Sequence, residues 1–415
     1  SIGGVGVRRL LPLYPAAALS SGAFSTPRQR GLSLSAIRGA ELDSSLPLFA
    51  EEKHIDKLAI AADSSTVEDW SGDVLFVPVF AEPRETSSAS ADAETEDDDE
   101  ENGGEEEASN AARSAGFVLP DGSVAQLVDR RLEGLLSDVV DEMEWKARAG
   151  STVWARAPRG HASKKVVLYG LGQPGDKCGA EAMQKFGAYV ASFSAQQKAQ
   201  KVGVVMPAVG EAGTTAEAPS QDLVMGLLGA MYKDSRFKSS KAAKKAPKLE
   251  SIALLGGHEE EIQRAKAIWS GVQLAKDLVS APANVLTPTS MAEMAASLAK
   301  ELGLECEIFD KEEILKRKMG AYYGVAKGAV HPPKFIHLCY KPSGETKTKV
   351  AIVGKGLTFD SGGYNLKVGA ATIELMKKDM GGSGATFGAA RAIGTLKPKN
   401  VEVHFIVAAC ENMVS

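Results

Sequence analysis

The chain has 415 residues, of which 44% are hydrophobic and 24% charged, a composition typical of globular proteins with room for two domains. No apolar run reaches the roughly 18 residues needed to cross a bilayer, which argues against a membrane-spanning role. The net charge of −5 comes from one acidic cluster within residues 92–107, and the body of the chain is near neutral, so its charge does not favour a nucleic-acid partner.

The first 45 residues have the composition of an organelle transit peptide. Arginines are scattered among Ser, Ala and Leu, and no acidic residue precedes Glu41. Pro12 and Pro15 interrupt the only apolar run, which disfavours a secretory signal, and a disordered basic tail is the alternative. Composition alone does not separate a plastid from a mitochondrial address.

Residues 46–257 are predicted to form a first α/β domain. Its strand-like and helical segments alternate, which favours a largely parallel sheet with helices on its faces. Strands are expected at 73–80, 164–170, 202–207 and 251–257, and helices at 124–143, 180–198 and 222–232. Residues 82–115 are too polar to bury themselves, so a disordered acidic insert is expected there.

Residues 258–415 are predicted to hold a linker helix and a second α/β domain. The linker helix, 259–278, has apolar residues at helical spacing and no strand of its own. Further helices are expected at 287–303 and 383–395, and strands at 334–340, 349–354 and 401–409. The fold class is therefore α/β, with two domains whose central sheets are largely parallel.

Several sequence patterns are only weak evidence for a nucleotide-binding or metal site. Gly170 to Gly175 matches a dinucleotide loop, but a glycine-rich chain produces such matches by chance, and no acidic residue ends the next strand to hold a ribose. His404 is better explained as a packed strand residue than as a metal ligand. The cysteines are far apart, which favours reduced buried thiols over disulfides or a thiolate zinc site: Cys178, Cys306, Cys339 and Cys410.

The segment VGKGLTFDSGGYNLK, residues 353–367, is more unusual. Lys355 and Asp360 are expected to leave the end of a buried strand, where open α/β sheets bind ligands, and Asp379 precedes the next helix. Helix-capping aspartates and solvated lysines are the alternative. Two carboxylates and one amine cannot fill two coordination spheres, so spacing alone leaves a metal site open.

Residues 274–415 resemble leucyl aminopeptidases of the cytosol aminopeptidase family almost continuously. The motifs LAKDLVSAPANVLTP, MGAYYGVAKGA, VGKGLTFDSGGYNLK, ELMKKDMGG and FIVAACENM carry this resemblance. The likeness is strongest to plant and plastid members and extends more weakly through the N-terminal region. It implies a homohexamer that acts on peptide substrates, and it favours a plastid (chloroplast) location, with the cytoplasm or a mitochondrion as alternatives.

The resemblance also implies roles for individual residues. Two divalent cations, manganese or zinc, would be held by Lys355, Asp360 and Asp379, with Asp360 bridging both. A metal-binding lysine must be neutral, which two adjacent dications and burial would favour. Lys367 would stay charged and steady the developing oxyanion, and Met376 would line the pocket for a Leu-like first side chain.

One departure from the family pattern affects the expected activity. The family continues with Asn-Thr-Asp-Ala-Glu-Gly-Arg-Leu, whose Asp and Glu complete both metal sites, and this chain reaches Ser415 before that motif. The C-terminal catalytic domain is therefore expected to be partial and the 415 residues alone inactive. Residues 401–409 are expected to form an unprotected sheet edge.

Two functions of different classes follow from these observations. The first is a metalloaminopeptidase that removes N-terminal amino acids from peptides. The second is a non-catalytic oligomeric scaffold or binding protein that keeps the aminopeptidase fold. The intact set of Lys355, Asp360, Lys367 and Asp379 favours the enzyme, since a scaffold has no need of these side chains.

Overall fold

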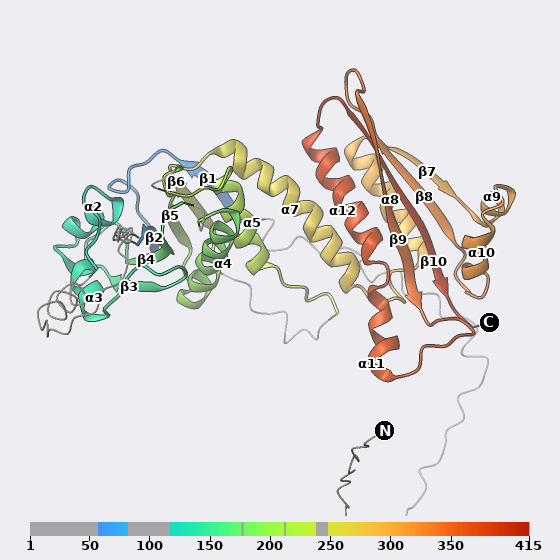
Figure 1. The fold of residues 1–415 in the computed structure, drawn as a ribbon, viewed down its shortest axis with the longest axis horizontal. Helices are drawn as coiled ribbons and strands as arrows, with labels where there is room; N and C mark the ends of the chain where they lie inside the picture. The colour runs from blue at the N-terminus through green and yellow to red at the C-terminus, as the bar shows by residue number, and fades with distance from the viewer. Residues whose placement is uncertain (1–56, 82–116, 176–177, 211–212, 238–247, 415) are drawn as a thin grey trace, which may run out of the picture. The chain divides into compact units, whose positions relative to one another are not determined.

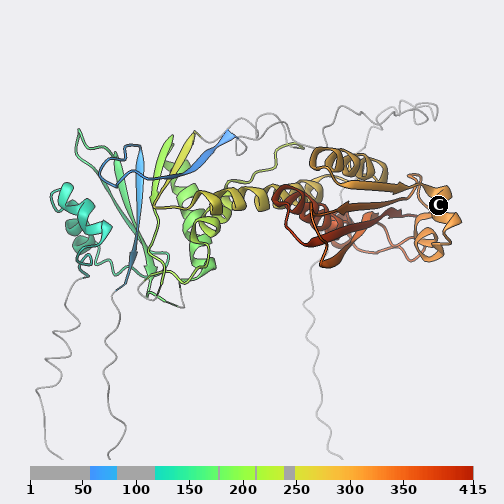
Figure 2. The ribbon, with the colours of Figure 1, turned by 90° about the horizontal axis from the view of Figure 1, so that it is seen from above.

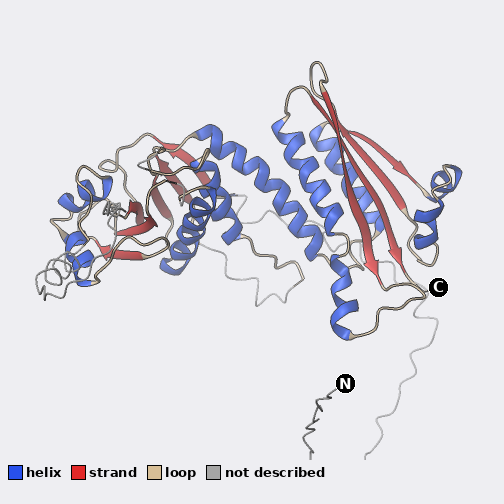
Figure 3. Cartoon of the chain, viewed as in Figure 1, coloured by secondary structure: helices blue, strands red, loops and turns tan. Residues whose placement is uncertain are grey.

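The structure, a computed structural model, describes residues 57–81, 117–175, 178–210, 213–237 and 248–414. The expected transit peptide and the acidic insert lie outside these residues. Within the described part of the chain, no helix combines the length and the apolar character needed to span a membrane. The helices and strands are arranged around two sheets (Figures 1 and 3).

The first sheet has six strands within the described residues, in the order β1-β6-β5-β2-β4-β3. Neighbouring strands are parallel except for β3, which is antiparallel to β4. The predicted strands correspond to β2, β4, β5 and β6, whereas β1 and β3 are additional. The strands are β1 Ala59–Asp63, β2 Val74–Phe80, β3 Thr152–Arg156, β4 Lys165–Gly172, β5 Lys201–Val205 and β6 Ser251–Leu255.

Helices cover both faces of this sheet. Since strand side chains alternate, Val74 and Phe76 of β2 face one layer while Leu75 and Val77 face the other. The first layer holds α4 Ala180–Gln197, α5 Pro219–Met231 and the start of α7 Glu259–Ser280, and the second holds α2 Val124–Arg131 and α3 Leu135–Glu142. Figure 2 shows strands of this sheet between α2 and α3 on one side and α4 on the other.

The single helix predicted over 124–143 is wrong, because the chain breaks between α2 and α3. Glu133 and Gly134 adopt left-handed conformations, with φ of 56° and 88°. The carboxylate of Asp129 accepts hydrogen bonds from the backbone N–H groups of Leu136 and Ser137 and so caps α3. The helical spacing of apolar residues continues across the break because both helices pack on the same sheet face.

Helices α4 and α5 cross with their backbones in contact at two glycines. A Cβ on Gly187 would lie 1.9 Å from the carbonyl oxygen of Leu223, and one on Gly226 would lie 1.9 Å from that of Gln184. Any side chain would force the helices apart, so the packing of this layer depends on glycine at both positions.

Asp73, just before β2, holds three segments together. Its carboxylate accepts the N–H groups of Gln200 and Lys201 at 2.7 and 3.0 Å and pairs with Lys164 Nζ at 2.6 Å. Burial disfavours the charged carboxylate, but these contacts outweigh it and lower the pKa of Asp73 to about 2.

We expect Asp73→Ala to lower the free energy of unfolding at pH 7 by about 1–2 kcal/mol, after allowance for solvent screening. The native pKa lies below the unfolded value of 3.8, so this stabilisation is present above that pH and is lost as pH falls toward 2. Urea denaturation at pH 7 and pH 3 measures the effect. A difference between wild type and variant that is no smaller at pH 3 would contradict it.

The second sheet has four strands within the described residues, in the order β7-β8-β10-β9. The β7/β8 and β8/β10 pairings are antiparallel and the β10/β9 pairing is parallel. The α/β class and the predominance of parallel pairing over both sheets are confirmed, although this second sheet is mixed. Its strands are β7 Glu305–Phe309, β8 Lys334–Tyr340, β9 Thr348–Asp360 and β10 Val401–Asn412.

Strand β10 is not a sheet edge, contrary to the prediction for residues 401–409. It lies between β8 and β9 and pairs with both along most of its length. Sequence order does not reveal this insertion, because β10 is the last strand in the chain but an inner strand of the sheet. In the described sheet the edges are β7 and β9, and Val353 of β9 is 72% exposed.

The two helices predicted at 287–303 and 383–395 are present, and both pack on one face of this sheet. α8 Pro288–Leu302 begins with a capping box formed by Thr287 and Ser290, and α12 spans Gly381–Leu396. The end of α7 joins them through Leu274 and Leu278, which share a core with Phe387 and Phe405. The short helices are α9 Lys311–Lys316, α10 Gly320–Ala326, α11 Ala370–Ile373 and the 3-10 helix η3 Glu374–Lys378.

Candidate metal centre

The predicted site residues gather where β9 and β10 end side by side. Strand β9 is longer than predicted, so Lys355 lies within it and Asp360 is its last residue. Asn412, the last residue of β10, stands in register with Asp360. Asp379 directly follows η3 and precedes α12.

Glycines bring the start of α12 directly onto β9. A Cβ on Gly354 would lie 2.6 Å from the carbonyl oxygen of Gly382, and one on Gly382 would lie 2.8 Å from the backbone nitrogen of Lys355. This close approach explains how a residue ahead of α12 reaches a strand side chain: Lys355 Nζ is 2.8 Å from Asp379 Oδ1.

The Asp360 carboxylate is 9% exposed and heavily hydrogen-bonded. Oδ2 accepts from Lys367 Nζ at 2.7 Å, while Oδ1 accepts from Asn412 Nδ2 at 2.8 Å and from the Gly362 N–H at 2.9 Å. Burial opposes the charged form, but Lys367 and then Asn412 and Gly362 more than compensate and lower the pKa of Asp360. The carboxylate is therefore ionised and fixed in direction.

One carboxylate oxygen of Asp379 is placed to bind a cation. Its Oδ1 accepts a hydrogen bond from Lys355, whereas Oδ2 is buried and accepts none within the described residues, although Lys355 Nζ lies 2.8 Å away. A buried carboxylate oxygen without a hydrogen bond is unfavourable unless a charged group satisfies it.

Lys367 is held in its charged form by carboxylates. Its hydrogen bond with Asp360 raises its pKa, against some desolvation, and the charge of Asp379 adds to this effect. The influence of both aspartates indicates that Lys355, Asp360, Lys367 and Asp379 form one group of alternating charges, with two ammonium groups beside two carboxylates. Such a group can bind cations and stabilise negative charge.

Met376 lies on η3, three residues before Asp379, and is half-buried. Its carbonyl oxygen accepts the backbone N–H of Asp379 at 3.1 Å, so its backbone helps to orient the carboxylate. The prediction that its side chain lines a substrate pocket stays a prediction.

Asn412 and a second group of polar residues were not predicted from the sequence. The contact of Asn412 with Asp360 could not be predicted, because it depends on the register between β9 and β10. His404 was predicted to be only a packed strand residue, but it lies beside Glu402 and Cys339. It is eight residues from Asn412 on β10, which is about 26 Å at about 3.3 Å per residue. The prediction of buried cysteines is correct for Cys178, Cys339 and Cys410 and wrong for Cys306, which is exposed.

Two protein-family models match the chain. The N-terminal domain of the cytosol aminopeptidase family matches residues 118–241, and the catalytic domain of the same family matches residues 273–415. The second range contains the whole charged group and Met376.

Cyanobacterial relatives align over most of the chain. The probable cytosol aminopeptidase of Acaryochloris marina is 41% identical over 361 residues, which are 86% of this chain and 65% of the relative. The corresponding proteins of Synechococcus elongatus and Microcystis aeruginosa are 46% and 47% identical, over 71% of this chain and 58% and 59% of their own lengths. The chain thus spans less than two thirds of each of these relatives.

A solved structure shares the fold. A mutant of tomato leucine aminopeptidase superposes with a TM-score of 0.66 and 33% sequence identity, over 86% of this chain and 64% of that one. The predicted family and α/β fold are confirmed by these matches.

Proposed function

The chain belongs to the cytosol aminopeptidase family, and from this premise we propose that it acts as a metal-dependent leucyl aminopeptidase. The reaction would release N-terminal amino acids, Leu-like ones preferentially, from peptides. The observation that carries this proposal is the group of Lys355, Asp360, Lys367 and Asp379, which come from β9, the segment after it and the residue after η3. The whole group lies inside the range of the catalytic-domain match.

The donor set of this group suits divalent cations. Metal dependence is general to the family. The ionised Asp360 and the Asp379 Oδ2, which accepts no hydrogen bond within the described residues, are oxygen ligands that manganese or zinc accepts. We propose that Asp360, Asp379 and the neutral amine of Lys355 hold two such ions. When bound, these ions would supply a hydroxide nucleophile near neutral pH and polarise the substrate carbonyl.

The two lysines would serve different purposes. Lys355 forms an ion pair with Asp379, whose Oδ2 accepts no hydrogen bond within the described residues, so both side chains could turn toward a bound cation. Lys367 has a raised pKa and keeps its proton, which lets it donate a charged hydrogen bond to the oxyanion of the tetrahedral intermediate. Asn412 would keep Asp360 in place through its 2.8 Å hydrogen bond.

Substrate choice, assembly and location complete the proposal. Met376 would form part of an apolar pocket for the first side chain of the peptide. A homohexamer and a plastid location follow from the family resemblance. Light scattering of the purified protein tests the homohexamer. Imaging of residues 1–45 fused to a fluorescent protein tests the plastid location.

The test is leucine amide hydrolysis in added manganese and after chelation with EDTA. It compares the 415-residue chain with a chain extended by the segment that carries the family's other metal ligands. We expect metal-dependent hydrolysis by the extended chain and little or none by the 415 residues, because Asp360, Asp379 and Lys355 provide too few ligands for two ions.

Two outcomes would change this assignment. Hydrolysis that survives chelation would contradict the metal-dependent mechanism. An extended chain that is folded, binds metal and yet hydrolyses no amide would favour a non-catalytic scaffold with the aminopeptidase fold.

A further inference from the structure

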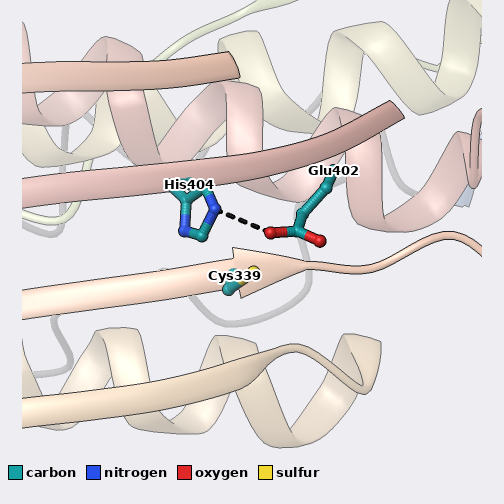
Figure 4. A group of neighbouring side chains, drawn as sticks. All are labelled: Cys339, Glu402 and His404. Atoms are coloured by element: carbon teal, nitrogen blue, oxygen red, sulfur yellow. Dashed lines mark hydrogen bonds and ion pairs between the residues drawn. The ribbon is translucent and has the colours of Figure 1, made fainter. Parts of the chain in front are cut away.

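A second set of metal-ligating side chains lies on the second sheet, far from the charged group of the candidate metal centre. Cys339 of β8 and Glu402 and His404 of β10 each offer one ligand atom, and these atoms lie within 4.8 Å of one another. Figure 4 shows His404 and Glu402 directed toward each other, with Cys339 on the neighbouring strand. The proposed aminopeptidase mechanism gives none of these three residues a role.

Strand geometry places the three side chains together without a loop. Glu402 and His404 are two positions apart on β10, so they share a face while Val403 and Phe405 point into the core. Cys339 stands directly opposite His404 in the β8/β10 register. Because Cys339 and His404 have strand partners on both sides and Glu402 is paired with β9, the backbone fixes this arrangement before any ligand binds.

The chain of contacts from Glu307 through His337 and His404 to Glu402 lacks one proton when both imidazoles are neutral. Glu307 Oε2 lies 3.3 Å from His337 Nδ1, His337 Nε2 lies 2.9 Å from His404 Nδ1, and His404 Nε2 lies 2.9 Å from Glu402 Oε1. Each of the three contacts needs one proton, whereas two neutral imidazoles carry two N–H groups and ionised carboxylates carry none.

This deficit holds for every choice of tautomers. One contact must bring two lone pairs together unless an imidazole is charged or a cation lies at that place. If His404 carries its proton on Nδ1 and donates to His337, its Nε2 has a lone pair that faces the Glu402 oxygen and Cys339. The contact between Nε2 and Glu402 is then the one without a proton.

We propose that Cys339, Glu402 and His404 bind one thiophilic transition-metal ion, of the class of Zn²⁺. A sulfur, a nitrogen and a carboxylate oxygen are the ligand types that zinc combines in proteins. His404 binds through Nε2, and its Nδ1–H donates to His337, which Glu307 orients from β7. This outer pair keeps the His404 ring in position, as partners of metal-binding histidines do.

The observed spacing needs only a small adjustment to hold the ion. Zinc bonds of about 2.0–2.3 Å place tetrahedral ligand atoms about 3.3–3.6 Å apart. The present separations, 2.9 Å for His404 to Glu402 and at most 4.8 Å for the others, lie on either side of that range. Lys349, which bonds Glu402 Oε1 at 2.9 Å, is 67% exposed and can swing away.

The ion can reach this site from solvent. The His404 side chain is 28% exposed, while Glu402 and Cys339 are almost fully buried. Three protein ligands leave one position of a tetrahedral ion for water, so the site is open in the manner of exchangeable rather than fully enclosed zinc sites.

The experiment uses the 415-residue chain, stripped with EDTA and then titrated with CoCl₂ and ZnCl₂. Asp360→Ala with Asp379→Ala provides a background in which the candidate metal centre cannot contribute. In this background we expect one cobalt ion per chain, with a thiolate-to-cobalt charge-transfer band that zinc abolishes by displacement.

Single substitutions identify the ligands. Cys339→Ser should remove the charge-transfer band, and Glu402→Gln, which preserves volume, should weaken cobalt binding at least about tenfold. His337→Ala should weaken it about ten- to a hundredfold while the band remains. Cys306→Ser is the matched control, because this cysteine lies on β7 outside the cluster and should change neither quantity.

The proposal fails if the background chain shows no thiolate band, or if Cys339→Ser leaves the band unchanged. Either result would mean that a shared proton on His337 and His404 supplies the missing charge. Circular dichroism confirms that each variant is folded, and Glu402→Gln gives an independent result if the cysteine variant does not fold.

Discussion

Asp360→Ala is expected to lower leucine amide hydrolysis by at least about a thousandfold in a catalytically complete chain. Asp360 is one of the carboxylates that would hold the cations, and it also binds Lys367 and Asn412 at 2.7 and 2.8 Å. Its loss would therefore disturb the metal ions and the ammonium group together. Steady-state kinetics and metal content by atomic emission measure the two effects separately.

Glu374→Ala is the matched control for this variant. Glu374 is an exposed carboxylate at the start of η3, close to the charged group in sequence but outside it. The Glu374→Ala protein should retain nearly full activity and metal content. An Asp360→Ala protein that keeps its oligomeric mass and its activity would remove Asp360 from the proposed mechanism.

Gly226→Ala is expected to cost about 3 kcal/mol or more of the free energy of unfolding. The added methyl group would lie 1.9 Å from the carbonyl oxygen of Gln184, a backbone atom that cannot rotate away. Helices α4 and α5 must then separate, which opens the core around Leu223 and Leu227. The midpoint of urea denaturation measures the loss.

The same substitution three residues later should not destabilise the protein. A Cβ on Gly229, also in α5, would meet only Trp269 at 3.9 Å, so the methyl group fits. Since alanine favours helix over glycine by about 1 kcal/mol, Gly229→Ala should be neutral or stabilising. Equal denaturation midpoints for the two variants would show that the α4/α5 contact is looser than described.

Long or strongly patterned elements were predictable from sequence. The helix predicted at 287–303 has clear signals in Thr287, Pro288 and Gly303, and α8 occupies nearly the same residues. Strand β9 was predicted too short, because Gly354 and Gly356 weaken the strand pattern, yet pairing with β10 carries it on to Asp360. The candidate metal centre was foreseen through its motifs, and its individual roles remain predictions.

Short edge strands and long-range pairings were not predictable. β1, β3 and β7 have five residues each and lie at sheet edges, where one side lacks a partner and the hydrophobic pattern is weak. Asn412 beside Asp360 and Cys339 beside His404 depend on strand register between distant segments. A single sequence contains no local signal for such neighbours.

The position of β1 has a consequence for how the protein is made. Among the described strands, β1 pairs only with β6, the last strand of its sheet in the chain, and the Ala62 N–H donates to Glu259 across 197 positions. At about 5–20 residues per second, a ribosome needs about 10–40 s to synthesise that stretch. During this interval β1 has no partner strand, so completion of the first sheet is a slow, late event that leaves the nascent chain dependent on protection from aggregation.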